Sequence, residues 1–141
     1  MGISREYKKG RSFVTIMVVI AFCALVLRFG IEKIIKVTIV QNETHASTAI
    51  KLISAALENY AKDNRGVYPD NLAILTQNKP SYLDRDYIRQ SPIRGYIYSC
   101  SRLESSGYSC SAAPNTCGLT GKISYSISTG NLLISEDCGK K

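Results

Sequence analysis

The feature that most constrains this chain is an apolar run near its N-terminus, because residues 13–27 contain no charged side chain. A helix that crosses a bilayer needs about twenty apolar residues, so this run is short. Arg11 and Arg28 at its two ends can extend their guanidinium groups toward water, and an interrupted apolar pattern continues to residue 40. We therefore predict a single-pass transmembrane helix anchored by Phe13, Ile16, Val19, Phe22 and Leu27.

The positive charge of the chain is concentrated beside this run. The net charge is +7, and residues 1–36 hold seven of the 18 basic residues but only two of the 11 acidic ones. A basic segment beside a membrane helix favours a cytoplasmic N-terminus in contact with anionic headgroups. The rest of the chain is nearly balanced, whereas a nucleic-acid surface would need a basic face on the folded domain. We expect the lipid bilayer as a partner and no nucleic acid.

Two targeting segments have a similar pattern and are the alternatives to a membrane span. A cleaved secretory signal also has a basic tail and a short apolar stretch, but it needs small residues before its cleavage site. The large residues from Leu25 to Phe29 offer no such site. A lipoprotein signal would place a small residue before its cysteine, whereas Phe22 precedes Cys23. We expect Cys23 to be an ordinary apolar residue of the helix.

Beyond the apolar run, the sequence predicts that the same helix becomes amphipathic. Between residues 46 and 61 apolar side chains recur at steps of three and four, which places them on one helix face. The opposite face is expected to be polar and to carry Lys51, Ser54, Glu58 and Lys62. His45 is also expected to be solvated, and residues 42–44 match an N-glycosylation sequon, a motif that often occurs by chance. The helix is expected to end near residues 64–66.

The residues after this helix predict a short helix, an aromatic loop and a small antiparallel sheet. Asp70 is expected to cap the short helix, which runs through Leu75. The strand signals cover residues 95–100, 108–110, 122–128 and 132–135, with a turn at 129–131. A helix followed by an antiparallel sheet is an α+β arrangement. We divide the chain into a basic tail (1–12), an apolar helix half (13–40) and an extracytoplasmic globular domain (41–141).

Four cysteines lie in the last third of the chain: Cys100, Cys110, Cys117 and Cys138. In a small exported domain this number predicts two disulfides, because such domains bury too little surface to be stable without reinforcement. The cysteines lack the closely spaced pairs that zinc sites favour. Three pairings are open from sequence, and we favour Cys100 with Cys110 across a hairpin and Cys117 with Cys138.

Eight tyrosines are interpreted as packing residues and alternatively as a ligand surface: Tyr60, Tyr68, Tyr82, Tyr87, Tyr96, Tyr98, Tyr108 and Tyr125. We prefer the first interpretation, in which the rings fill the helix–sheet interface and the hydroxyls reach its edge. No Ser-His-acid set, metal cluster or phosphate-binding loop is present in the sequence, so we expect neither an enzyme nor a cofactor. Asp84 and Asp86 are a weak case for calcium, which needs about six oxygens.

The order of these features resembles the type IV pilins and the pseudopilins of type II secretion systems. The resemblance covers the layout of residues 9–100 and rests on Lys9-Gly10, the run from Phe13 to Ile20, Leu57-Glu58-Asn59-Tyr60 and Gly66-Val67-Tyr68-Pro69. It implies a pilin-like fold and a leader that a prepilin peptidase cuts between Gly10 and Arg11. The family usually has glutamate at the fifth mature position, where this chain has Thr15, or Met17 if counted from Phe13.

The resemblance also implies a function and a place in the cell. A pilin-like chain is held in the bacterial inner membrane with its domain in the periplasm, and it joins copies of itself or other pilin-like subunits on an assembly platform. We therefore expect a structural subunit of a pilus-like or pseudopilus filament. The alternative is a single-span, membrane-anchored binding module that does not polymerise, which the missing glutamate and Arg28 favour.

Overall fold

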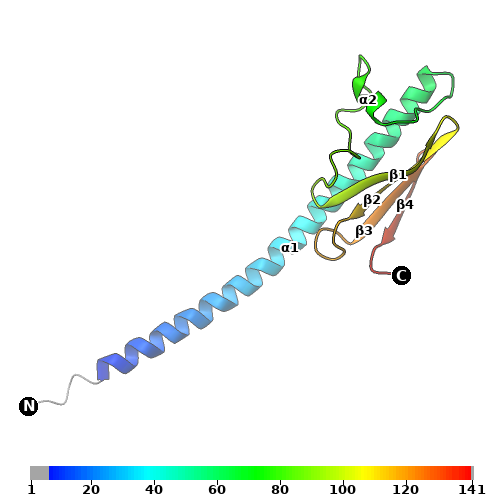
Figure 1. The fold of residues 1–141 in the computed structure, drawn as a ribbon. Coiled ribbons are helices and arrows are strands. Elements are labelled where there is room, and N and C mark those ends of the chain that lie inside the picture. The colour runs from blue at the N-terminus through cyan, green and yellow to red at the C-terminus, as the bar shows by residue number, and fades with distance from the viewer. Residues whose placement is uncertain (1–6, 141) are drawn as a thin grey trace, which may run out of the picture. The chain divides into compact units, whose positions relative to one another are not determined.

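The computed structural model describes the backbone of residues 7–140 and the side chains of residues 12–140. Its elements are α1 (Tyr7–Asp63), α2 (Ala73–Gln77), β1 (Tyr96–Glu104), β2 (Gly107–Pro114), β3 (Ile123–Ser128) and β4 (Leu132–Asp137) (Figure 1). The chain divides into two compact units, Met1–Val37 and Thr38–Lys141, and α1 contributes to both. One long helix followed by an antiparallel sheet confirms the predicted α+β class.

The first unit contains the N-terminal part of α1. Between residues 12 and 37 every side chain is exposed except that of Ile35, which is partly buried. An α-helix pairs its backbone N–H and C=O groups within the same segment. For this reason the segment can be helical although the rest of the described chain does not cover its side chains.

The second unit packs the C-terminal part of α1 against the sheet (Figure 1). The buried helix face follows the predicted steps of three and four residues and consists of Ala46, Ala49, Ile50, Ile53, Ala56, Leu57 and Ala61. It forms one core with inward-facing residues of the sheet, among them Tyr98, Tyr108 and Ile127. Removing apolar surface from water stabilises such a core by roughly 25 cal/mol per Å².

The sheet is an antiparallel meander in which β1, β2, β3 and β4 are neighbours in chain order. Residues alternate across it, so that Tyr125 and Ile127 of β3 are buried in the core. The residues between the inward-facing ones point away from the helix, and they include the serines Ser99, Ser109, Ser111, Ser124, Ser126 and Ser128. The inner face is therefore aromatic and aliphatic, whereas the outer face carries serines on β2 and β3 and exposed apolar residues on β1 and β4, namely Ile97, Leu132 and Ile134.

β1 and β2 extend well past the strands predicted at residues 95–100 and 108–110. β1 continues to a turn at Ser105 and Ser106, and its register against β2 shifts between Cys100 and Arg102. This β-bulge adds a residue to one strand and interrupts the alternation of apolar and polar side chains. The bulge accounts for the early predicted end of β1, whereas the missed residues 111–114 of β2 pair with residues 96–99 outside the bulge.

The helix ends test two further predictions. α1 ends at Asp63 as expected, and Arg65 and Gly66 follow with φ angles of 58° and 83°. The prediction that Asp70 caps the short helix is wrong. The Asn71 side chain instead accepts a hydrogen bond of 2.9 Å from the Ala73 N–H group. α2 begins at Ala73, so the carboxylate of Asp70 lies one residue too early to take this place.

Candidate membrane-anchoring surface

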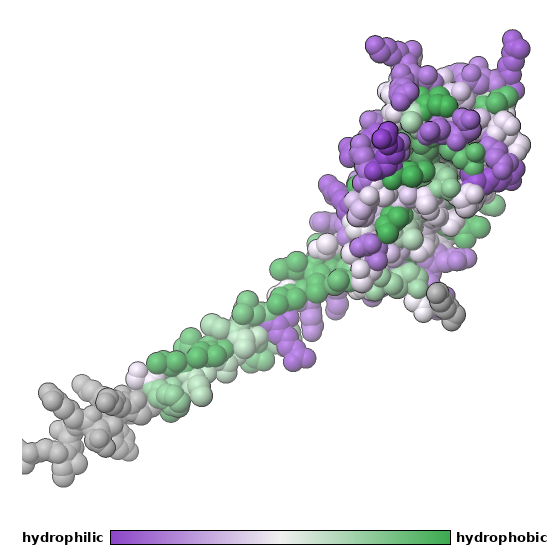
Figure 2. Space-filling view, viewed as in Figure 1, coloured by the Kyte–Doolittle hydropathy of each residue, from purple (hydrophilic) through white to green (hydrophobic). Residues whose placement is uncertain are grey.

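The five predicted anchor residues all lie on exposed helix surface. The exposed fraction of each residue is 64% for Phe13, 54% for Ile16, 53% for Val19, 67% for Phe22 and 63% for Leu27. Figure 2 shows mainly hydrophobic residues along this part of α1. The described helix contains an 18-residue window that is apolar enough to cross a membrane, and none of that window is buried.

This surface is apolar on every side of the helix. An amphipathic surface helix would keep one polar face toward water, but a helix that is hydrophobic all round needs lipid or protein around it. Arg28, Lys33 and Lys36 follow the apolar run and are exposed. Long basic side chains at this place can reach an aqueous interface while their stems stay in an apolar layer. The geometry therefore suits one membrane span or one helix of a bundle.

The predicted peptidase site lies mainly outside the described residues. Gly10 and Arg11 belong to α1 by their backbone, but the side chain of Arg11 is not among those described. Residues 1–6 of the basic tail also lie outside the described part. Cleavage between Gly10 and Arg11 stays a prediction.

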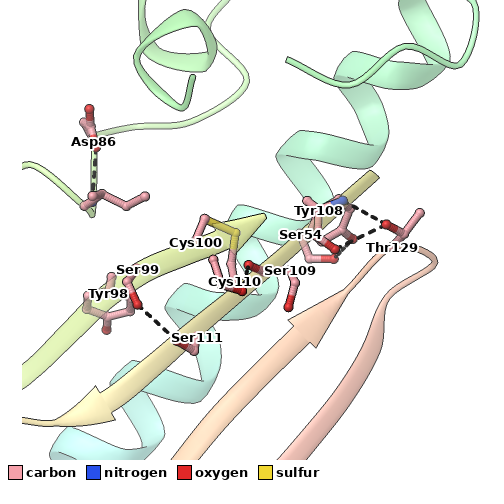
Figure 3. The surroundings of a disulfide bond; sticks show 12 residues. Ser54, Asp86, Tyr98, Ser99, Cys100, Tyr108, Ser109, Cys110, Ser111 and Thr129 are labelled. Carbon is pink, nitrogen blue, oxygen red and sulfur yellow. Dashed lines mark hydrogen bonds between the residues drawn. A yellow bond between two sulfur atoms is a disulfide. The ribbon is translucent and has the colours of Figure 1, made fainter. Parts of the chain in front are cut away.

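Ser54 and Glu58 do not lie on a solvated helix face, and this prediction is wrong. Ser54 is fully buried and bonds the Tyr108 hydroxyl at 2.6 Å and the Asn131 side chain. Glu58 accepts hydrogen bonds from the hydroxyls of Tyr108 at 2.9 Å and Tyr68 at 3.0 Å. Figure 3 shows Ser54 directed toward Tyr108 and the neighbouring Thr129.

The Glu58 carboxylate joins three separate segments of the second unit. Besides the two hydroxyls, it accepts the Gly130 N–H group at 2.9 Å, which lies in the turn between β3 and β4. Partial burial alone would raise the pKa of Glu58, but the bonds from Gly130, Tyr108 and Tyr68 hold that pKa below its usual value. We call Ser54, Glu58, Tyr68 and Tyr108 the helix–sheet network. A sequence signal existed, because Ser54 and Glu58 lie four residues apart at the margin of the apolar face.

The tyrosines pack in the core as predicted. Tyr87, Tyr96, Tyr98, Tyr108 and Tyr125 are buried, and Tyr60, Tyr68 and Tyr82 pack against the same core while partly exposed. The Tyr96 hydroxyl donates to the Ile123 carbonyl at 2.7 Å. Burial raises the pKa of Tyr98 to about 12, and its hydroxyl is shielded without a hydrogen-bond partner. These rings therefore stabilise the fold.

The four distal cysteines form two disulfides, Cys100–Cys110 and Cys117–Cys138, which is the pairing that the sequence favoured. Cys100 and Cys110 lie directly opposite each other on β1 and β2 (Figure 3). The second disulfide joins the loop before β3 to the residue after β4. Cys23 is free and exposed on the apolar helix surface.

His45 differs from the expected solvated histidine. It is partly buried, and its Nδ1 atom is shielded from solvent and has no hydrogen-bond partner among the described residues. Partial burial, together with nearby Arg94 and Arg85, lowers the pKa of His45, and Asp84 opposes this effect. The side chain of Asn42 in the sequon also makes a contact within the fold, because its amide nitrogen donates a hydrogen bond to the Thr120 carbonyl at 2.9 Å. This bond uses the atom that a glycan would occupy.

The two loop carboxylates considered for calcium serve local contacts. Asp84 forms an ion pair of 3.0 Å with Arg85, and one Asp86 oxygen accepts the N–H groups of Ile88 and Arg89, each at 3.1 Å. In the described part of the chain, no three His, Cys, Asp or Glu residues gather as metal ligands would.

Comparison with known families and with curated proteins yields no match to this chain. Its architecture nevertheless combines a long apolar N-terminal helix, a small antiparallel sheet and two disulfides. This combination is compatible with the pilin-like fold that the sequence resembles.

Proposed function

We propose that this chain is a structural subunit of a pilus-like or pseudopilus filament, held in the bacterial inner membrane before assembly. The observation that carries the proposal is the exposed apolar surface of residues 13–27 on a helix whose later part packs on a disulfide-linked domain. Lipid and a bundle of identical helices are both apolar surroundings. The same surface can therefore serve a stored subunit and an assembled one.

The disulfides support a domain on the extracytoplasmic side. Disulfides persist in oxidising compartments such as the periplasm, and the basic N-terminal tail favours the cytoplasmic side for that end of the chain. A subunit with this orientation presents its domain outward when its helix enters a bundle. The partners would be copies of this chain or other pilin-like subunits, a prepilin peptidase and an assembly platform.

The alternative is a membrane-anchored module that stays single. Arg28 favours it, because this exposed cation follows the apolar run and would be costly in the dry interior of a bundle. The lack of glutamate at Thr15 or Met17 also removes the usual partner for a neighbouring N-terminus in pilin-like filaments.

The mass of the intact protein from its native membrane separates the two proposals. A mass without residues 1–10 or 1–12 supports a processed filament subunit, and an added methyl group would strengthen that result. A full-length mass in a chain that stays single supports the anchored module. Reduction should add about four hydrogens, because each of the two disulfides takes up two.

Cys23 provides a second test because it is a free thiol on the proposed contact surface. A mild oxidant should join Cys23 of neighbouring copies in sheared filaments, giving a dimer that reduction reverses. Cys23→Ser should abolish the dimer and leave the two distal disulfides unchanged. Full-length mass together with absence of the dimer in wild-type membranes would reject the filament proposal.

A further inference from the structure

The second unit contains a cleft of about 370 Å³. It is lined by Val40, Gln41, Thr44, His45, Thr48 and Arg94. The lining contains a cation and a histidine but no carboxylate. The Thr44 and Thr48 hydroxyls donate to carbonyls of α1 itself, so the groups left to bind a ligand are those of Gln41, His45 and Arg94.

Arg94 reaches this cleft from a tight turn. Ile93 and Tyr96 exchange two backbone hydrogen bonds of 2.8 and 3.0 Å, and the two residues between them, Arg94 and Gly95, have φ angles of 46° and 74°. Positive φ at both central positions is typical of a type I′ turn, for which Asn-Gly is the preferred sequence. Arginine is unusual there, and such strain often marks functional positions.

Two contacts of Gly95 hold the turn that carries Arg94 in place. The Gly95 carbonyl accepts the Asn115 N–H group at 2.8 Å. A Cβ atom at Gly95 would lie 2.7 Å from the Cβ atom of Thr120, so the turn is packed closely against that residue. The turn therefore fixes the direction of the Cα–Cβ bond of Arg94 whether or not a ligand is bound.

Two polar groups of the cleft lack partners in the described part of the chain. Arg94 forms neither of the ion pairs found there, which are Arg85 with Asp84 and Arg102 with Glu104. The Nδ1 atom of His45 is shielded and makes no hydrogen bond. Because Nδ1 is shielded, the ring presents its other nitrogen, Nε2, to a ligand in the cleft.

We propose that Arg94 and His45 form a binding site for a phosphate group at this cleft. A guanidinium group can donate two parallel hydrogen bonds to phosphate oxygens, and an imidazole N–H can donate a third. The choice of phosphate over other anions rests on the proposed membrane anchor, because phosphate is the anionic group of lipid headgroups. The site itself does not require a filament.

Protonation of His45 should strengthen phosphate binding at this site. The charged groups that face His45 are Arg94, Arg85 and Asp84, and together they disfavour the protonated imidazole when no anion is bound. A bound phosphate reverses that balance, so anion and proton should bind together.

The experiment uses His45 as its reporter, because it is the only histidine of the chain. The full chain is placed in maltoside micelles, which contain no phosphate, and inorganic phosphate is titrated at constant ionic strength while the imidazole resonances are followed by NMR. Acetate serves as the carboxylate probe. We expect a saturable shift with phosphate, and the midpoint of the His45 titration should move to higher pH when phosphate is bound.

Arg94→Asn is the decisive variant, because asparagine suits the left-handed position and should preserve or raise the melting temperature. We expect it to weaken phosphate binding by about tenfold or more, the effect of losing a charge-assisted pair. Arg102→Gln, which removes one positive charge elsewhere, should leave binding unchanged. Equal binding by wild type and Arg94→Asn would overturn the proposal, as would an acetate response as strong as that to phosphate.

Nanodiscs identify the source of the phosphate. If phosphatidylglycerol discs without inorganic phosphate shift the His45 resonances in wild type and Arg102→Gln but not in Arg94→Asn, the ligand is a lipid headgroup. If inorganic phosphate alone has this effect, the ligand is a soluble phosphate compound. No saturable response in either arm would overturn the site, and none of these outcomes depends on whether the chain polymerises.

Discussion

The two parts of α1 have the same backbone but differ in where their apolar side chains find contacts. Residues 13–27 are apolar all round and exposed, whereas residues 46–61 are apolar on one face and bury it against the sheet. The second part is therefore stabilised by the chain itself. The first part depends on lipid or on other chains, because nothing in the described chain buries it.

Polar residues follow the same division. Ser54 and Glu58 point into the second unit, where hydrogen bonds satisfy them. Arg28 and Glu32 in the first unit are exposed. A polar group inside a domain must be paired within the domain, and a polar group beside an apolar run must reach water. Helix periodicity alone does not separate these two cases.

The largest effect should come from the buried helix face. Leu57→Ala leaves a cavity where the side chain is fully buried, and we expect a loss of about 2–5 kcal/mol in the free energy of unfolding. Urea denaturation in maltoside micelles, followed by near-ultraviolet circular dichroism of the tyrosines, measures it. Leu52→Ala, on the exposed side, and Leu27→Ala, in the first unit, should each change it by less than about 0.5 kcal/mol. A comparable loss in Leu27→Ala would erase the distinction between the two parts.

A charge in the first part should act on membrane retention and leave the domain intact. Val19→Arg places an arginine within the apolar run, where insertion costs about 3 kcal/mol. We expect part of the protein to leave the membrane fraction after carbonate extraction, with an unchanged urea transition of the domain. Leu52→Arg is the matched control, because Leu52 is 48% exposed in the second part and this variant should stay in the membrane. Full retention of Val19→Arg would contradict a membrane span.

Removal of the Cys117–Cys138 disulfide should destabilise only the second unit. Its cysteines are 21 residues apart, and restriction of a loop of that length in the unfolded chain stabilises a protein by about 3 kcal/mol. The double variant Cys117→Ser and Cys138→Ser should unfold at lower urea but remain membrane-bound. Cys23→Ser should match wild type in both measurements. An unchanged urea midpoint in the double variant would show that the link does not stabilise the domain.

The smallest effect concerns the helix–sheet network. Glu58→Gln should cost about 1–2 kcal/mol near neutral pH, with solvent screening keeping it modest at this partly exposed residue. Because the pKa of Glu58 is lowered in the folded state, its stabilisation is present above the usual carboxylate pKa and is lost as the pH falls through the folded value. The free energies of unfolding of wild type and Glu58→Gln should therefore converge as the pH is lowered from 7 to 3. If the difference in free energy of unfolding between wild type and Glu58→Gln stayed the same at every pH, the result would contradict the network. Glu136→Gln, at an exposed residue, is the control.

Sequence patterns predicted the elements of this fold better than their contacts. The step of three and four residues located the buried face from Ala46 to Ala61. The number of cysteines predicted two disulfides and left three pairings open, of which the favoured one is the pairing found. Periodicity failed at Ser54, because a small hydroxyl beside the apolar face can be buried once Tyr108 supplies a partner from 54 residues away. His45 and Arg94 were missed for the same reason, since a turn nearly fifty residues later brings them to one cleft. Such encounters depend on tertiary structure, which local pattern does not contain.

The Cys100–Cys110 bond has a consequence for how the sheet finds its correct alignment. Serines recur at every second position of β2 and β3, so sliding one strand past the other by two residues would again match hydroxyl with hydroxyl on the outer face. That face consequently carries little information about alignment. A covalent bond between directly opposed residues of β1 and β2 admits a single alignment of that pair, so the alignment of β3 on β2 is left to their buried residues, such as Cys110 opposite Ile127.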